Sequence, residues 1–157
     1  MRRILFVCLG NICRSPTAEA VMRHRLEAAG LGGEVEVESA GTGSWHVGHP
    51  PDERSTAAAL RRGVELGGSA RQVGPEDFER FEMLIAMDEQ NLADLRALAP
   101  VPEHEEKVRL LREFDPTAVE AGDLAVPDPY YGEGDGFELV LDVVERACEG
   151  LVESLRR

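Results

Sequence analysis

Two cysteines and an arginine lie within seven residues near the start of the chain, in the segment VCLGNICRSP at positions 7–16. Cys8 follows a run of apolar residues, and Arg14 precedes a serine and a proline. A thiolate is a strong nucleophile, and the planar guanidinium of an arginine can bind two phosphate oxygens at once. The residue types therefore predict either a thiol pair for redox or metal chemistry, or one nucleophilic cysteine with Arg14 as its partner.

A strand and a helix are expected on either side of this segment. Residues 4–8 form a continuous apolar run, typical of a strand buried on both faces of a parallel sheet. Pro16 can occupy the first position of a helix with Ser15 as its cap, and apolar residues then recur at helical spacing until Gly30. The unit predicted is a strand, a tight loop and a helix.

The loop between them is suited to binding an anion. Gly10 and Asn11 tolerate a positive φ, so the loop can curl until several backbone N–H groups point at one centre. The N-terminus of the following helix adds its dipole to this concavity. A phosphate held there by Arg14 would face Cys8, whose thiolate form is favoured by the same helix end and cation.

Other interpretations of these residues were weighed. A cysteine at the end of a strand is often a small buried apolar residue. A zinc site is disfavoured because no second cysteine pair follows, and because the histidines show no ligand spacing; these are His24, His46, His49 and His104. The loop also lacks the GK[ST] ending of a nucleotide-binding loop. We therefore expect no metal and no cofactor.

The rest of the chain predicts an α/β fold. Further strands are expected at 35–40, 83–87 and 107–111, and the strand at 35–40 could lie at a sheet edge. Helices are expected at 52–62, from Asp88 to Leu98 and from Phe137 to the end, with a helical turn at GPEDF (74–78). The stretch 115–136 shows little periodicity. The alternation indicates a single domain, residues 1–157, with a central four-stranded, mostly parallel sheet and helices on both faces.

The pattern C-x5-R-S between a buried strand and a proline-initiated helix resembles the phosphate-binding loop of the low-molecular-weight protein tyrosine phosphatases. The resemblance implies that Cys8 is the nucleophile, that Arg14 binds the equatorial phosphoryl oxygens and that Ser15 helps the thiolate to leave. It also implies that Asn11 holds the loop from a left-handed conformation, supported by Ser39 of ESAGT (38–42). The loop comprises Leu9, Gly10, Asn11, Ile12, Cys13, Arg14 and Ser15.

A phosphatase of this kind also needs a group that protonates the departing oxygen and later activates water. In PDPYYG (127–132) two prolines restrict the backbone around Asp128. Taken alone, this segment is typical of a proline turn anchored by tyrosines. Its resemblance to the DPYY segment of the same family implies that Asp128 is the acid and then the base, and that Tyr130 and Tyr131 form one wall of the cleft. Trp45 resembles the opposite wall, with a partly buried anchor as the alternative.

The resemblance extends over nearly the whole chain, through ARQV (70–73) and MDEQNL (87–92). One departure is Gly68, which stands where many members of the family carry a histidine that supports the loop asparagine. No function is assigned to residues 101–126.

Composition limits the partners and the location. The 17 basic and 30 acidic residues give a net charge of −13, which disfavours binding to nucleic acid or to an anionic membrane. No apolar run approaches the roughly 20 residues of a membrane span, and the N-terminal apolar run is too short for a signal peptide. Three cysteines, an odd number, do not form a secreted disulfide framework. We expect a cytoplasmic monomer or weak dimer whose partner is a phosphotyrosine-containing protein or a small aryl phosphate.

Several competing functions share parts of the pattern. Arsenate reductases relay oxidation through further cysteines, whereas only Cys148 lies outside the loop here, on an apolar helix face. Protein arginine phosphatases place a threonine where Ile12 stands, and the larger isoleucine favours a planar aryl group. The phosphocarrier modules of sugar transport lack the arginine. A phosphate-binding module without catalysis would need the loop but not Asp128.

Cys13 has two interpretations. It can fill space behind the loop, or it can form a disulfide with Cys8 under peroxide and so protect the nucleophile from irreversible oxidation.

Overall fold

The computed structural model describes residues 2–129 and 136–156. Four strands form one sheet in the order β2-β1-β3-β4, and every neighbouring pair is parallel. The strands are β1 (Arg2–Cys8), β2 (Val35–Gly41), β3 (Met83–Ala86) and β4 (Val108–Leu110). The expected four-stranded α/β fold is confirmed, with β2 at a sheet edge as anticipated.

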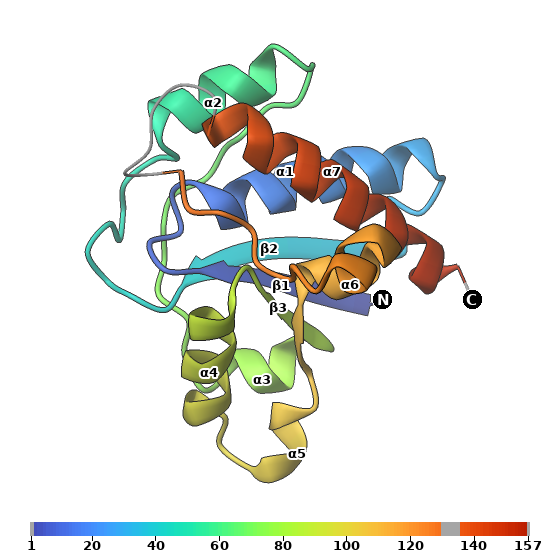
Figure 1. Cartoon of the computed structure of the whole chain (residues 1–157). Coiled ribbons are helices and arrows are strands. Elements are labelled where there is room, and N and C mark those ends of the chain that lie inside the picture. The colour runs from blue at the N-terminus through green and yellow to red at the C-terminus, as the bar shows by residue number, and fades with distance from the viewer. Residues whose placement is uncertain (1, 130–135, 157) are drawn as a thin grey trace.

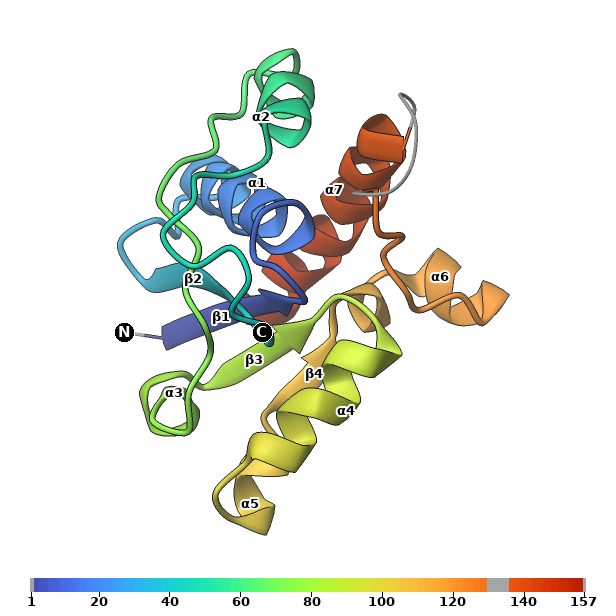
Figure 2. The same cartoon turned by 90° about the vertical axis from the view of Figure 1, so that its left-hand side faces the viewer.

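Helices cover both faces of the sheet (Figures 1 and 2). On one face lie α1 (Arg14–Ala28), α2 (Glu53–Leu60) and α7 (Gly136–Leu155), and on the other lie α3 (Asp77–Arg80), α4 (Glu89–Leu98) and α5 (Pro102–Glu105). A 3-10 helix, η1 (Leu111–Phe114), and α6 (Pro116–Ala121) follow β4. In the described part of the chain no helix is long and apolar enough to cross a membrane.

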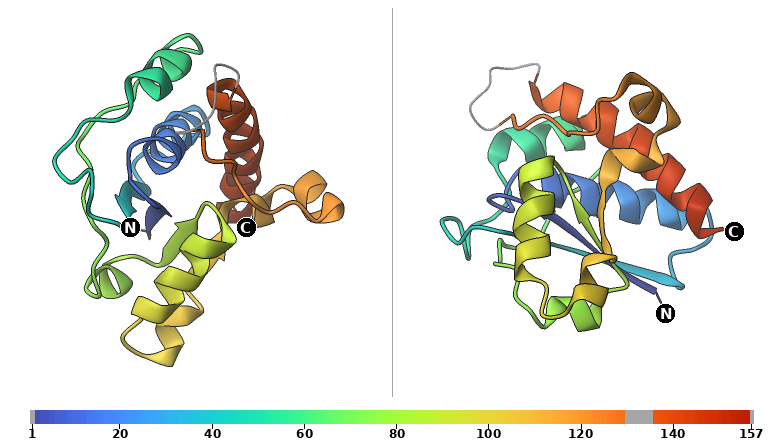
Figure 3. Two further views of the ribbon diagram at one scale, coloured as in Figure 1. Left: turned by 60° about the vertical axis from the view of Figure 1, so that its left-hand side comes forward. Right: turned by 60° about the horizontal axis from the view of Figure 1, so that its bottom comes forward.

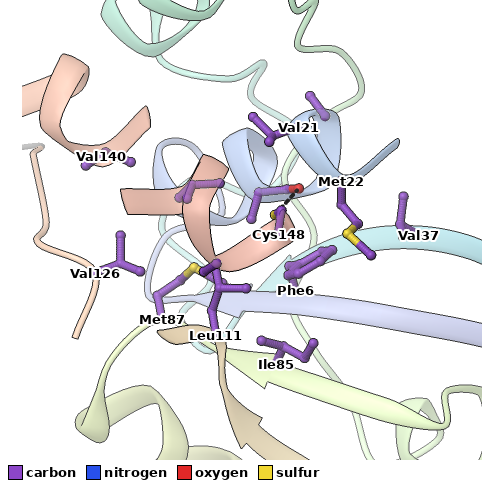
Figure 4. Packing of buried hydrophobic residues seen from close by; sticks show 14 of the residues in the cluster. Phe6, Val21, Met22, Val37, Ile85, Met87, Leu111, Val126, Val140 and Cys148 are labelled. Atoms are coloured by element: carbon purple, nitrogen blue, oxygen red, sulfur yellow. Dashed lines mark hydrogen bonds between the residues drawn. The ribbon is translucent and has the colours of Figure 1, made fainter. Parts of the chain in front are cut away.

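β1 lies between the two layers because its side chains alternate between them. Ile4 and Phe6 pack in the cluster formed with α1 and α7. Leu5 and Val7 pack in the cluster on the opposite face of the sheet, and all four residues are fully buried. Figure 4 shows Phe6 against Met22 and Cys148. Each such side chain contributes about 1.5–3 kcal/mol when buried. The central position of β1 fixes Cys8, its last residue, at the carboxyl edge of the sheet.

The end of β2 makes room for the loop that follows β1. Cys8 is paired in register with Gly41. A Cβ on Gly41 would lie 2.7 Å from the carbonyl oxygen of Leu9 and 3.1 Å from the amide nitrogen of Asn11. Contacts this short are repulsive, so only glycine lets the loop pass over β2 at this point.

Two expectations about local structure are wrong. Helix α1 begins at Arg14, and Ser15 lies inside it and is not its cap; the residue at the cap position, Cys13, makes no side-chain cap hydrogen bond. The stretch from 115, expected to be irregular, contains α6, where the Asp115 side chain caps the Thr117 amide, Pro116 takes the first position and Gly122 ends the helix at φ +70°. These start and stop signals were readable, but a helix of six residues is too short to show periodicity.

Candidate active site

A cavity of about 510 Å³ opens at the carboxyl end of β1, where parallel α/β sheets bind ligands. Three segments that are far apart in the sequence line it: the β1–α1 loop, the loop after β2 and the segment before α7. The lining residues are Cys8, Leu9, Gly10, Ile12, Cys13, Arg14, Trp45, His46 and Asp128. The fold thus brings Cys8, Arg14, Trp45 and Asp128 together. Tyr130 and Tyr131 lie outside the described residues.

The sulfur of Cys8 is buried and surrounded by donors. The Asn11 backbone N–H donates to Cys8 Sγ at 3.3 Å. Ser15 Oγ lies 3.0 Å from the same sulfur and accepts a hydrogen bond from Asn11 Nδ2 at 2.8 Å; toward a Cys8 thiolate, which has no proton to give, the serine hydroxyl is the donor. Its other acceptor, the Ala40 carbonyl oxygen, is farther away at 3.3 Å. A sulfur that accepts two hydrogen bonds carries negative charge at lower energetic cost.

Asn11 gives the loop its shape. Its φ of 57° makes it the one non-glycine residue with a positive φ in residues 2–129 and 136–156. Besides its bond to Ser15, Nδ2 donates to Ser39 Oγ at 3.0 Å, and Oδ1 accepts from the Arg71 backbone N–H at 3.0 Å. These bonds stabilise a conformation that costs an L-residue about 1–2 kcal/mol.

Gly10, which could tolerate a positive φ, does not adopt one. A Cβ on Gly10 would lie 3.0 Å from His46 Cδ2, so the glycine leaves space for the histidine.

The contact expected between Ser39 and Asn11 is present, and Glu19 extends it. Ser39 Oγ donates to Glu19 Oε1 at 2.8 Å, and Glu19 Oε2 accepts from Arg23 at 2.7 Å. Gly68, which stands where many members of the family carry a histidine, has a φ of +79°, and no atom lies within 4 Å of the position that its Cβ would take. Glu19, on α1, and the Arg71 amide supply the support for Ser39 and Asn11. Sequence analysis missed Glu19 because its contact to β2 depends on the packing of α1.

Arg14 is held in one orientation inside the site. Its side chain is 4% exposed, and Nη1 donates both to Asp88 Oδ2 at 2.7 Å and to the Val126 carbonyl oxygen at 3.0 Å. Fixing Nη1 orients the planar group, whose Nε and Nη2 form the edge that a phosphate can bind with two hydrogen bonds. Nη2 lies 3.7 Å from Asp128 Oδ2.

Asp88 has two partners, of which the sequence indicated one. Oδ1 accepts from the Asn91 backbone N–H at 2.8 Å, so the expected cap of α4 is confirmed. Oδ2 binds Arg14. The available signal for this second role was the position of Asp88 just beyond β3, because β3 pairs with β1 and their carboxyl ends share one edge of the sheet.

Trp45 is a cavity wall and not a buried anchor. Its side chain lines the cavity while the residue is 70% exposed. The ring lies against Gly43, where a Cβ would come within 2.0 Å of it. His46, the next residue, was not expected to line the cavity, and nothing in its spacing indicated that it would.

The two remaining cysteines differ in position but share one property. Burial raises the pKa of the Cys13 thiol to about 12, and a hydrogen bond with Ser55 opposes this rise. Burial also raises the pKa of Cys148 to about 12. Cys148 packs in the core near α1, with its sulfur 4.0 Å from the Ala18 carbonyl oxygen (Figure 4). Both thiols are therefore protonated at neutral pH.

Within the described residues, no group of three or more His, Cys, Asp or Glu side chains is placed to hold a metal ion. The chemistry available at the cavity is that of a sulfur nucleophile, an anion-binding loop and a carboxyl group.

Comparison with known proteins gives a consistent result. A family model described as "Low molecular weight phosphotyrosine protein phosphatase" matches residues 3–157. A low molecular weight protein-tyrosine-phosphatase of Streptomyces coelicolor is 53% identical, over 98% of this chain and 93% of the relative. The crystal structure of a protein tyrosine phosphatase from Entamoeba histolytica with Hepes in the active site has a TM-score of 0.94 at 38% identity, covering 99% of this chain and 97% of that one. A drosophila arginine phosphatase has a TM-score of 0.91 at 31% identity, covering 100% and 99%.

The loop conformation can be tested by changing Asn11 in two ways. Asn11→Gly removes the side-chain hydrogen bonds, but glycine still adopts the left-handed backbone conformation readily. Asn11→Ala removes the same hydrogen bonds and also disfavours that conformation. We expect the alanine variant to be less stable than the glycine variant by about 1–2 kcal/mol in urea unfolding, because alanine resists the left-handed conformation. Orthovanadate should bind both variants at least about tenfold more weakly, since the donors around Cys8 lose their support.

Gly10→Ala is the matched control for this comparison. Gly10 lacks a positive φ, and its new methyl group would meet only the end of the His46 side chain. Its stability should change by less than that of Asn11→Ala. Equal stability of Asn11→Ala and Asn11→Gly would show that the backbone conformation does not depend on Asn11.

Proposed function

This chain belongs to the low molecular weight phosphotyrosine protein phosphatase family, and we propose that Cys8, Arg14 and Asp128 are the residues with which it hydrolyses phosphate esters. It is a cysteine-dependent protein-tyrosine phosphatase acting on phosphotyrosine in proteins and on aryl phosphates. The observation that carries the residue assignment is the cavity floor, where Cys8 Sγ accepts hydrogen bonds beside the oriented guanidinium of Arg14.

The first step transfers the phosphoryl group to Cys8. The thiolate attacks phosphorus, the S–P bond forms, and the P–O bond to the aryl group breaks. Arg14 and the loop N–H groups bind the equatorial oxygens, whose negative charge is shared among them in the transition state. Protonated Asp128, which lines the same cavity, gives its proton to the departing oxygen, so that a neutral phenol leaves.

The second step returns the enzyme to its starting state. Asp128, now a carboxylate, takes a proton from a water molecule, which attacks phosphorus as the S–P bond breaks. Inorganic phosphate is released, and Cys8 leaves as a thiolate. The Ser15 hydroxyl, 3.0 Å from the sulfur, supports that charge with a hydrogen bond. One carboxyl group thus serves as acid and then as base.

Ile12 and Trp45 favour an aryl substrate. Ile12 is 8% exposed and lines the cavity, and its branched side chain narrows the space near the phosphate. Trp45 offers a flat ring against which a phenyl group can pack. The likeness to a drosophila arginine phosphatase keeps phosphoarginine as the second candidate substrate.

The cellular setting is also a proposal. The net charge of −13 and the odd number of cysteines support a cytoplasmic monomer or weak dimer with no nucleic-acid or membrane partner.

The assignment predicts different losses for three variants. Cys8→Ser should abolish turnover of phenyl phosphate, and Arg14→Ala should reduce it by at least about 100-fold because an oxyanion-binding donor is lost. Asp128→Asn should reduce kcat/KM for phenyl phosphate by about 100-fold, but far less for 2,4-dinitrophenyl phosphate, whose leaving group needs no proton. Steady-state kinetics with both esters measures these effects.

A Cys148→Ser variant is the control for these losses, since Cys148 lies in the core. A chelator should leave all rates unchanged. Full turnover by Cys8→Ser would contradict the mechanism. An Asp128→Asn variant that hydrolyses phenyl phosphate as fast as the wild type would contradict the acid assignment.

The substrate preference predicts a response to Ile12→Thr. We expect the wild type to hydrolyse phosphotyrosine faster than phosphoarginine or phosphoserine, and Ile12→Thr to lower the phosphotyrosine-to-phosphoarginine ratio of kcat/KM by roughly tenfold, the effect of a small change in an apolar pocket. Release of phosphate from the three donors provides the measurement. A ratio that does not change on Ile12→Thr would remove Ile12 from the determinants of specificity.

The disulfide hypothesis for Cys13 predicts reversible inactivation by peroxide. Peroxide would oxidise the Cys8 thiolate to a sulfenic acid, and the Cys13 thiol would then displace water to form the disulfide, which dithiothreitol reduces. Cys13→Ser should lose activity irreversibly under the same treatment, whereas Cys148→Ser should behave as the wild type. If Cys13→Ser recovers as fully as the wild type, Cys13 only fills space.

A further inference from the structure

The Asp128 carboxyl is carried by a segment that contains no regular structure after α6. This segment, residues 122–129, begins at Gly122, where α6 ends. In Figures 2 and 3 (left) it is drawn in orange and runs from α6 into the space between the β1–α1 loop and α7. Because no helix or strand holds this segment, its contacts with the rest of the protein determine where the Asp128 carboxyl group lies.

Val126 holds the middle of the segment to the site. Its amide donates to the Met87 carbonyl oxygen at 2.7 Å, and its carbonyl oxygen accepts from Arg14 at 3.0 Å. Its side chain is 1% exposed and lies near Met87 and Leu111 in the core (Figure 4). Leu124, two residues earlier, packs against the cluster on the other face of the sheet.

Arg112 binds the same segment at two points, Ala125, which lies between Leu124 and Val126, and Asp123. It lies in η1 and is 8% exposed. Its Nη1 donates to the Ala125 carbonyl oxygen at 2.8 Å and lies 3.1 Å from Asp123 Oδ2. Its Nε is buried and has no hydrogen-bond partner in the described part of the chain. Arg112 does not line the cavity.

Because the Arg112 guanidinium is buried, its free energy depends on residues 122–129 staying within hydrogen-bond distance of it. An ion taken out of water loses its hydration, and only hydrogen bonds and opposite charge in the protein offset that loss. In the described part of the chain, both partners of the Arg112 guanidinium, Ala125 and Asp123, belong to this segment. Movement of the segment away from the sheet would leave a buried cation with its Nε and Nη1 unpaired, so this movement is disfavoured.

The chain between Ala125 and Asp128 is short and stiff. Three residues span at most roughly 10 Å when fully extended. Pro127 and Pro129 fix two φ angles around Asp128. The hydrogen bond from Arg112 to Ala125 therefore acts on the same short stretch that Val126 anchors, two residues before Pro127 and three before Asp128.

We propose that Arg112 is a positioning residue that holds residues 122–129 against the sheet and thereby keeps the Asp128 carboxyl facing the cavity. It touches neither the substrate nor Cys8 and acts through the Ala125 carbonyl group. The proposal rests on the role of Asp128 as acid and base stated above. It assigns a role in the reaction to residues 111–126, a region that the loop motif does not reach.

The test compares two esters that differ in their need for a proton. In Arg112→Ala, kcat/KM for phenyl phosphate should fall about tenfold or more, since small misplacements of a catalytic group are costly. For 2,4-dinitrophenyl phosphate it should fall less than about twofold, because its leaving group departs without an acid. Orthovanadate inhibition should change less than the turnover of phenyl phosphate, because Arg14 keeps its 2.7 Å bond to Asp88 and the β1–α1 loop is unchanged.

Two further variants separate positioning from general loss of structure. Arg112→Lys keeps one cationic donor for Ala125 and should recover part of the phenyl phosphate activity; it also replaces the alanine variant if that variant fails to fold. Arg109→Ala is the matched control, because Arg109 lies three positions earlier, is exposed and pairs with Glu113 instead of with residues 122–129. This control should retain the wild-type ratio between the two esters.

A double-mutant cycle with Asp128→Asn decides whether Arg112 acts through Asp128. In the Asp128→Asn background, Arg112→Ala should cause no further loss with phenyl phosphate, because the acid that it positions is absent. An equal loss with both esters, or a full additional loss in that background, would overturn the proposal while leaving the function of Asp128 intact. If Asp128→Asn alone leaves the ratio between the esters unchanged, the acid assignment itself fails and the role of Arg112 fails with it.

Discussion

The proposed mechanism places a negatively charged sulfur and an anionic phosphate in one small cavity of a chain whose net charge is −13. Bulk charge works against this, so the compensation has to be local. The structure concentrates it at the carboxyl end of β1, where the start of α1 points backbone dipoles at the cavity and Arg14 supplies the cation. The left-handed Asn11 and the side-chain-free Gly41 allow the loop to close around that centre.

The orientation of Arg14 depends on carboxylate and carbonyl groups from two other segments. Asp88 joins the guanidinium to the first turn of α4, and Val126 joins it to the segment that carries Asp128. The same side chain therefore links the proposed phosphate-binding group to the segment that carries the proposed acid, Asp128. Such a link is useful chemically, because the nucleophile and the acid must act on opposite sides of one phosphorus atom in a single step.

The residues of the β1–α1 loop could be predicted from the sequence, whereas contacts between elements that are far apart in the chain could not. Cys8, Asn11 and Arg14 belong to one strand–loop–helix unit, and the geometry of that unit follows from local patterns. Asp88 was identified as a helix cap because capping is also local, but its bond to Arg14 depends on β3 lying beside β1. Glu19 and Arg112 act through contacts across packed elements, which no spacing in the chain reveals. Ser15 was misread as a cap because its hydroxyl group has nearer partners in Cys8 and Asn11.

The central claim is that the phosphoryl group passes through Cys8. The most direct measurement is to quench the Asp128→Asn variant in acid during turnover of 2,4-dinitrophenyl phosphate, whose leaving group needs no proton, and to map the trapped phosphate by peptide mass spectrometry. In this variant the base for the second step is missing, so the intermediate should accumulate. The account predicts phosphate on the peptide that contains Cys8, and none after Cys8→Ser. Phosphate found on a histidine or another residue, or a Cys8→Ser enzyme that still forms a phosphoenzyme, would contradict it.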